Sequence, residues 1–439
     1  MDSILETIGT VIQSGWMSLL DYLAAHVLLC LVPAFFIAGA LSTLIPKEAI
    51  TKYLGPKAPK LVSYPAAAVG GFVLAVCSCT IMPLFAGIWR RGAGLGPAIT
   101  FLFVGPAVNI LAISYTGAAI GMDIALARII LSIFFGIGIG LTMAWLFRKS
   151  ENRVADVGLF DREARVRPAV WLFFGLLLAV LIVGTLQVSF LTGTWLTVEL
   201  PFELPAGFQS TLDGLDLTLQ GLSLILLLVV IAPLAWAGLD KVLDGFNRWT
   251  WATLGLVIVT LLLAAPTTEA DSLVVHLNGR FVGEVVLLTA LALVAARGLP
   301  RDELQGWLWE TWKFVKQIFP LLLVGVFGAG VIKAIIPETW IQSLAGSNTL
   351  WANLIGVLFG VFMYFPTLVE VPIANMFLDL GMHRGPLLAY LLADPELSLQ
   401  SILITSKILG KKKTAVYVSL VTVASTLAGW LFGLALAAW

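Results

Sequence analysis

Residues 76–97 read VCSCTIMPLFAGIWRRGAGLGP, a stretch in which two cysteines one residue apart lie within an apolar segment that contains Pro83. The whole chain of 439 residues is similarly apolar, since 59% of its residues are hydrophobic and 12% are charged. Soluble globular domains carry about 25% charged residues. Backbone polar groups in lipid are best satisfied within helices, so the composition predicts an all-α, polytopic membrane protein.

Apolar segments long enough for membrane helices recur along the chain, since a bilayer core of about 30 Å takes about 20 residues. Two of them, 61–90 and 350–380, are unusually long and contain prolines. We expect each of these two to fold as a helix hairpin, with tips at 77–80 and 364–367. The full set is 17–45, 61–90, 97–117, 122–147, 168–192, 218–239, 249–265, 281–297, 314–337, 350–380, 386–406 and 413–437.

The two long segments belong to an internal repeat. Pro83 and Pro372 are 289 residues apart (372 − 83 = 289), and the same offset relates Pro106 to Pro395. Further pairs at this offset are Gly71 and Gly360, Gly92 and Gly381, Gly96 and Gly385, Pro97 and Pro386, and Leu102 and Leu391. We therefore expect a first transmembrane repeat over 1–147, a basic cytoplasmic loop with four linker helices over 148–313, and a second repeat over 314–439.

The distribution of Lys and Arg predicts how the repeats are oriented. Basic loops at 47–60, 148–167 and 407–413 should face the cytoplasm, whereas 193–217 and 266–279 contain acidic residues and no Lys or Arg and should face outward. If each long segment enters and leaves on one side, this pattern gives two inverted repeats, an architecture typical of transporters. The formal net charge is zero, so no nucleic-acid partner is expected, and the partner is the lipid bilayer.

Residues 77–109, CSCTIMPLFAGIWRRGAGLGPAITFLFVGPAVN, resemble the signature region of the ArsP/YraQ-type permeases. These are bacterial inner-membrane proteins associated with efflux of organoarsenicals and heavy metals. The resemblance extends over both repeats and implies a multi-pass permease of the bacterial cytoplasmic (inner) membrane that exports a thiophilic solute. Cys77 and Cys79 occupy the motif cysteines, whereas Cys30 has no counterpart in the family pattern.

The cysteines also suggest a site by their own chemistry. Trivalent arsenic and soft metal ions favour thiolate ligands, so Cys77, Ser78 and Cys79 are candidate substrate-binding residues. Cysteine is also a small apolar residue, and packing is the alternative interpretation. His26 and Cys30 lie four residues apart, on one face of a helix, and complete the metal-ligand candidates, although core packing is favoured for them.

Two asparagines lie near prolines that interrupt apolar segments. Asn109 follows Gly105-Pro106 and Asn375 follows Pro372, so either side chain could coordinate a solute. Each could instead cap backbone groups that the proline leaves without a partner.

Glu370 is the most informative charge, because its surrounding sequence, FMYFPTLVEVPIANMF, contains no counter-ion. A carboxylate at membrane depth is costly unless it is protonated, paired or hydrated. We interpret Glu370 as a candidate for proton coupling, with Asp394 and Glu396 as further candidates. The alternatives are a hydrogen bond from Glu370 to freed backbone, and a cap or surface loop for Asp394 and Glu396.

Other functional classes fit the sequence less well. The chain has no nucleotide-binding loop of the G-x-x-x-x-G-K-[ST] type, and one C-x-C pair with a lone cysteine does not make a thiol relay. We therefore expect a transporter without a cofactor rather than an enzyme, with a small molecule, metal or metalloid as substrate. The alternative function is uptake of a small sulfur-containing anion, and a weaker alternative is a membrane thiol oxidoreductase. Whether the protein forms a homo-oligomer is left open.

Overall fold

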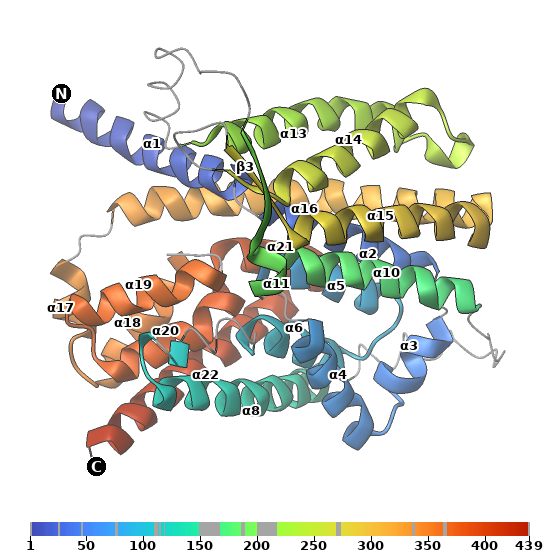
Figure 1. Cartoon of the computed structure of the whole chain (residues 1–439). Helices are drawn as coiled ribbons and strands as arrows, with labels where there is room; N and C mark the ends of the chain where they lie inside the picture. The colour runs from blue at the N-terminus through green and yellow to red at the C-terminus, as the bar shows by residue number, and fades with distance from the viewer. Residues whose placement is uncertain are drawn as a thin grey trace. The chain divides into compact units, whose positions relative to one another are not determined.

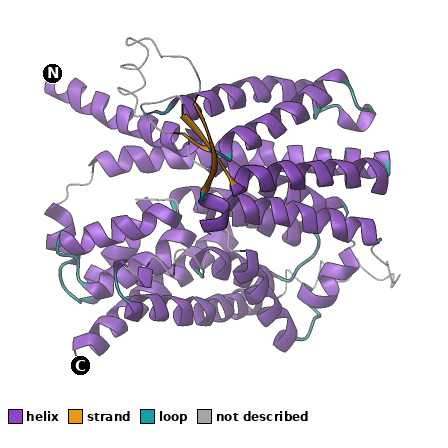
Figure 2. Cartoon of the chain, in the orientation of Figure 1, coloured by secondary structure: helices purple, strands orange, loops and turns teal. Residues whose placement is uncertain are grey.

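The computed structural model is almost entirely helical (Figures 1 and 2). Its contacts divide the chain into two compact units. The repeat unit comprises Met1–Trp16, Lys47–Ala164 and Ile318–Trp439, and the linker unit comprises Met17–Pro46 and Arg165–Gln317. The residues that the structure describes are 2–24, 27–44, 47–74, 78–108, 113, 116–117, 119–148, 167–185, 189–199, 217–268, 274–335, 339–362 and 367–437.

The predicted all-α fold of a polytopic membrane protein is confirmed. Six described helices are long and apolar enough to cross a bilayer, or seven spans if one bent pair is counted. The repeat unit contains α3 (Lys47–Leu54), α4 (Lys60–Leu74), α5 (Ser78–Arg90), α6 (Leu95–Ala107), α8 (Met122–Leu146), α17 (Thr339–Ala345), α18 (Leu350–Phe362), α19 (Thr367–Asp379), α20 (Arg384–Leu397), α21 (Leu399–Leu409) and α22 (Lys411–Ala437).

The linker unit is also helical but includes one small sheet. Two long helices, α1 (Asp2–Ala24) and α16 (Arg301–Ile335), contribute to both units. The other elements of the linker unit are α2 (Val27–Thr43), α10 (Pro168–Thr185), α11 (Ser189–Thr192), β1 (Thr194–Glu199), α13 (Leu219–Gly238), a 3₁₀ turn (Val242–Asp244), α14 (Arg248–Ala264), β2 (Thr267–Thr268), β3 (Val274–Asn278) and α15 (Gly279–Gly298).

Helices in the two halves of the repeat unit begin at equivalent positions. The starts of α5 and α19 differ by 289 residues (367 − 78), as do those of α6 and α20 (384 − 95) and of α8 and α22 (411 − 122). Gly92 and Gly381, which precede α6 and α20, adopt nearly the same left-handed conformation, with φ of +89° and +91°. The offset of 289 residues between matching residues is thus also the offset between the starts of matching helices.

The same glycines allow close helix packing in both halves. A Cβ on Gly140 of α8 would lie 2.6 Å from the carbonyl oxygen of Gly96 in α6. At the equivalent positions, a Cβ on Gly429 of α22 would lie 2.5 Å from the carbonyl oxygen of Gly385 in α20. No side chain fits between these backbones, so the α6–α8 and α20–α22 pairs both depend on glycine.

The breaks in the long segments differ in detail from the expectation. The helices end at Leu74 and Phe362 and resume at Ser78 and Thr367, while Pro83 and Pro372 lie inside α5 and α19. Proline is tolerated there because it removes only one backbone donor from a helix that packing supports. Part of each predicted tip, namely Cys77 and residues 364–366, lies outside the described residues.

A second difference concerns the segment 386–406, which was expected to break at Asp394-Pro395-Glu396. These residues lie within α20, and the chain bends by 44° between α20 and α21 instead. The bend is at Ser398, whose backbone is extended, with ψ of 146°. The helix therefore continues for two residues beyond Pro395, which keeps both acidic side chains on a regular helix.

The described parts of the acidic loops of the linker region form strands. β1, β3 and β2 make an antiparallel sheet in that order (Figure 2). In it, Thr197 of β1 lies opposite His276 of β3. The strands read TWLTVE and VVHLN, which are rich in β-branched and aromatic residues. In the region of the predicted first segment at 17–45, the structure has the end of α1, which begins at Asp2, and α2.

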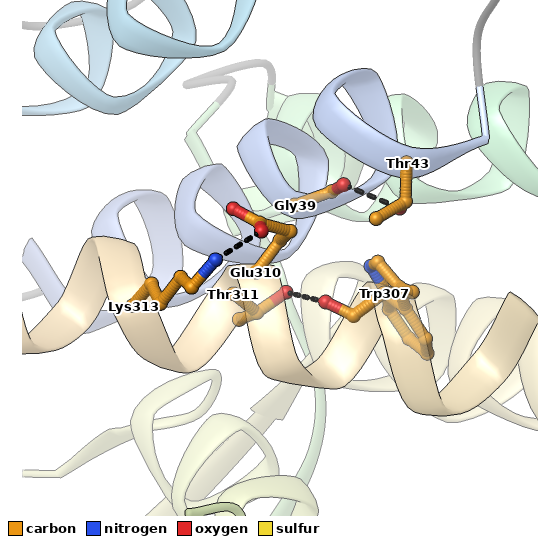
Figure 3. A network of polar contacts seen from close by, with 6 residues as sticks. All are labelled: Gly39, Thr43, Trp307, Glu310, Thr311 and Lys313. Atoms are coloured by element: carbon orange, nitrogen blue, oxygen red, sulfur yellow. Dashed lines mark hydrogen bonds and ion pairs between the residues drawn. The ribbon is translucent and has the colours of Figure 1, made fainter. Parts of the chain in front are cut away.

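Within the linker unit, α2 lies directly against the start of α16 (Figure 3). A Cβ on Gly39 would lie 2.1 Å from the hydroxyl oxygen of Thr311, which donates to the carbonyl of Trp307 at 2.9 Å. The indole nitrogen of Trp307 donates to the carbonyl of Phe36 at 2.8 Å. These contacts fix α2 on α16 next to the Lys313–Glu310 ion pair, whose atoms are 2.5 Å apart.

We predict that Gly140→Ala destabilises the protein whereas Gly138→Ala does not. The methyl group at Gly140 would overlap backbone, and overpacking of this kind costs about 1–3 kcal/mol. Gly138 lies on the same helix with no atom within 4 Å of its Cβ position, so alanine there should be neutral or stabilising by up to about 1 kcal/mol. Thermal unfolding of the purified variants measures both effects, and equal midpoints for the two would contradict the packing argument.

Candidate functional site: a buried ion cluster

Four ionisable side chains from three helices of the repeat unit lie together in its interior. We call Arg128 of α8, Glu370 of α19, and Tyr390 and Asp394 of α20 the ion cluster, and none of them is more than 1% exposed. Nη2 of Arg128 donates to Oε2 of Glu370 at 2.9 Å. Asp394 is within electrostatic range of both Glu370 and Arg128. One guanidinium thus pairs with Glu370 and lies near a second carboxylate, that of Asp394.

The position of Arg128 follows from the apolar face of α8. Ile124, Leu131 and Phe135 of this helix pack on an apolar core formed mainly by α19 and α20. Residues 124, 128, 131 and 135 are three or four apart and therefore share one helix face. Arg128 points with them into this core, which includes Phe377, whose ring packs edge-on against Tyr390 with centroids 5.2 Å apart. The ion cluster is therefore bordered by apolar side chains.

The hydrogen bonds within the ion cluster are incomplete. In the described part of the chain, no partner is found for Nε and Nη1 of Arg128, Oε1 of Glu370, Oδ1 of Asp394 or the hydroxyl of Tyr390. A buried ion pair needs further hydrogen bonds to offset the loss of hydration, so this arrangement adds little stability. Ionisable groups buried in this way within membrane helices are by default candidates for a functional site.

A second buried acid, Glu396, accepts a hydrogen bond from the residue at the position equivalent to Arg128. Arg128 and Tyr417 are related by the repeat offset (417 − 128 = 289). The hydroxyl of Tyr417 in α22 donates to Oε2 of Glu396 in α20 at 2.5 Å, and both residues are buried. The last helix of each repeat therefore presents one donor to a glutamate of the second repeat.

The acidic residues themselves have apolar counterparts in the first repeat. The offset of 289 matches Glu370 with Ile81 and Asp394 with Gly105. In the first repeat a Cβ on Gly105 would lie 2.7 Å from Cδ1 of Ile81, so an apolar side chain fills this position. Equivalent positions of the two repeats thus hold an apolar contact in the first repeat and two carboxylates in the second.

Of the acids predicted from the sequence, Glu370 and Asp394 come together and Glu396 lies in the neighbouring pair. Asn375 is five residues after Glu370, about 140° around α19, and so lies on another side of that helix. Cys77, Asn109 and His26 lie outside the described residues, as do the side chains of Ser78, Cys79 and Cys30. No group of three or more metal ligands is found among the described side chains.

Two expectations about the acids need correction. Glu370 has no counter-ion near it in sequence, but it has one in space, and it pairs with Arg128 rather than with freed backbone. Asp394 and Glu396 are buried in α20 rather than exposed in a loop. Arg128 was missed by the sequence analysis, although a single arginine within the apolar segment 122–147 is as unusual as Glu370.

A polytopic helical protein with a duplicated helix set and ionisable groups buried between the repeats has the architecture of a membrane transporter. Comparison with known proteins agrees, since the model of a family described as predicted permease (ArsP_1) matches residues 14–434. UPF0718 protein MJ0584 of Methanocaldococcus jannaschii is 36% identical over 438 residues, which cover 99% of this chain and 98% of that protein. No solved structure matches significantly.

The chain belongs to this predicted permease family, which confirms the resemblance drawn from residues 77–109. It is accordingly a multi-pass membrane protein, and family membership favours a transporter over an enzyme.

We predict that Arg128→Met destabilises the protein more than Glu370→Gln does. Removing the guanidinium leaves two buried carboxylates without a counter-ion, and loss of one partner of a buried pair costs about 3–5 kcal/mol. Removing the charge of Glu370 still leaves Asp394 to balance Arg128. Thermal unfolding of each single variant and of the double variant measures the difference, and a larger cost for Glu370→Gln would show that Asp394 does not share the guanidinium.

Proposed function

We propose that this permease exports a thiophilic solute, either a trivalent organoarsenical or a soft metal ion, across the bacterial cytoplasmic membrane. Cys77 and Cys79 bind the soft atom, with Ser78 between them. Protons exchanged in the ion cluster drive transport. The observation that carries this proposal is that two buried carboxylates lie near one buried guanidinium, which pairs with Glu370.

The charge of the ion cluster supports coupling to protons. Arg128 balances one carboxylate, and the second would be an uncompensated charge in a buried site. An isolated buried carboxylate is so costly that the group takes up a proton or a cation instead. When a proton leaves the pair Glu370 and Asp394, the local charge changes by one unit, and this change can favour one of two transporter states over the other.

The repeat relates the cysteines to the ion cluster. Ile81, the counterpart of Glu370, is two residues after Cys79 on α5. α5 also contacts the second repeat, since the hydroxyl of Thr405 in α21 donates to Sδ of Met82 at 3.7 Å. Cys79 therefore lies two residues before the position that corresponds to Glu370, and this closeness supports joint action on one transport path.

Uptake of a small sulfur-containing anion is the second candidate. A pocket of about 320 Å³ in the repeat unit favours it, because Lys60, Arg148 and the first residues of α6 contribute to its lining. Helix N-termini and cations attract anions. The excess of carboxylates over guanidinium in the ion cluster would repel an anion, however, and for this reason we place export of a thiophilic solute first.

We predict that expression of the protein in a sensitive host raises tolerance to trivalent organoarsenicals or to a soft metal ion. Cys77→Ser combined with Cys79→Ser should abolish this tolerance at unchanged protein level, because a hydroxyl is a poor ligand for a soft atom. Cys30→Ser is the matched control and should protect as the parent does. A double serine variant that protects equally well would show that the thiols only pack.

We also predict that Glu370→Gln uncouples transport from protons. Glutamine keeps the shape and hydrogen-bonding capacity of the side chain but cannot exchange a proton. In vesicles with an imposed pH gradient, solute flux through the parent should follow the gradient, whereas Glu370→Gln should bind solute and ignore the gradient.

Asp379→Asn at the exposed end of α19 is the control and should behave like the parent. If Glu370→Gln still follows the gradient and Asp394→Asn does not, coupling belongs to Asp394. If both still follow it, the ion cluster is not the coupling site.

A further inference from the structure

The linker unit contains another buried acid, which takes no part in the proposed function. Glu284 lies on α15, one of the helices long and apolar enough to span a bilayer, and it is fully buried. Neither of its carboxylate oxygens has a hydrogen-bond partner in the described part of the chain. Arg280, one turn earlier on α15, acts on it electrostatically.

The surroundings of Glu284 are apolar. Phe281 and Leu288, three residues before it and four after it, flank it on the same helix face. Both pack on an apolar cluster that includes Leu29 of α2 and Leu261 of α14. A carboxylate in such surroundings is stable only if a positive charge or a proton accompanies it.

The backbone carbonyl of Leu29 and the carboxylate of Glu284 lie near the same point of α10. A Cβ on Gly184 of α10 would lie 2.9 Å from the carbonyl oxygen of Leu29 and 3.2 Å from Oε1 of Glu284, so these two oxygens flank one point between three helices. In a regular helix the carbonyl of Leu29 would accept from the amide of residue 33. That residue is Pro33, which lies inside α2 and has no N–H.

We propose that Glu284 and the carbonyl of Leu29 form a binding site for a monovalent cation, either a proton or Na⁺. In the protonated form the carboxyl group donates its hydrogen to the carbonyl oxygen, which satisfies both. Na⁺ is a hard cation that takes oxygen ligands, and freed carbonyls at helix breaks bind Na⁺ or protons in transporters. Gly184 leaves the space that the site needs. The proposal does not depend on the cysteines or on the ion cluster.

Few other charged or titratable groups lie on the elements packed against α15. They are Arg280 and Arg297 on α15 itself, His276 on β3, Arg248 at the start of α14, and Cys30, which follows Leu29 on α2. α10 and α11 contribute none. The response of Glu284 can therefore be separated from theirs by a substitution at position 284 alone.

The test is the thermal unfolding of the purified full chain in detergent, in two arms. The first compares NaCl with choline chloride at constant pH and ionic strength, and the second varies pH between 5.5 and 8.5 without Na⁺. A cation that binds the folded state alone should raise the unfolding midpoint by about 1–3 °C for each tenfold increase above its Kd. A response in the first arm assigns Na⁺, and a midpoint that rises as pH falls assigns the proton.

Two variants decide the assignment to this site. Glu284→Gln, whose amide can donate to the Leu29 carbonyl, should fold and lose the cation response. Pro33→Ala supplies an N–H to that carbonyl and should weaken the response, whereas Pro65→Ala on α4 is the control and should not. Glu370→Gln should keep any response to Na⁺, and the difference between the parent and Glu284→Gln in the pH arm should persist when both also carry Glu370→Gln. This separates the site from the proposed function. If the parent and Glu284→Gln respond identically in both arms, the proposal is wrong.

Discussion

The ion pair between Arg128 and Glu370 joins the two repeats at a place where neither side chain is more than 1% exposed. Charges in such a place must be balanced locally, because burial removes most of their hydration and most of the screening by salt. The guanidinium comes from the first repeat and both carboxylates come from the second. A movement of one repeat against the other would change the distances between these charges, and this is the link that the proposed proton coupling requires.

This link requires helices that meet at fixed positions, and the glycines of the repeat unit provide them. Gly96 and Gly140 let α6 and α8 approach to backbone contact, and Gly385 and Gly429 do the same for α20 and α22. Small residues of this kind drive helix packing in membranes, where apolar surface alone gives no preference between lipid and protein. Arg128 and Tyr417 lie at equivalent positions of α8 and α22. Because each helix packs closely on its partner, both side chains reach their acidic partners in the same way.

Much of the fold could be predicted from the sequence, because the spacing of glycines and prolines and the hydropathy of each segment can be read directly from it. The offset of 289 residues between Pro83 and Pro372 is also the offset between the starts of α5 and α19. The pairing of Glu370 with Arg128 was beyond such reasoning, since the two are 242 residues apart and meet only through helix packing. The strands β1 and β3 were missed because their alternation is short and lies between long apolar segments. Glu284 was missed because it lies near the start of the predicted segment 281–297 and close to Arg280, where a charged residue is expected at the polar end of a span.

The asymmetry between the repeats explains how a duplicated fold can carry out a directional process. Inverted repeats with identical side chains would favour neither of two mirror-related states. Here the position held by Ile81 and Gly105 in the first repeat is held by Glu370 and Asp394 in the second, and Arg128 corresponds to Tyr417. Of these matched positions, only those of the second repeat hold carboxylates. Under the proposed proton coupling, a proton bound there would favour one state over the other, because its free energy of binding would differ between them.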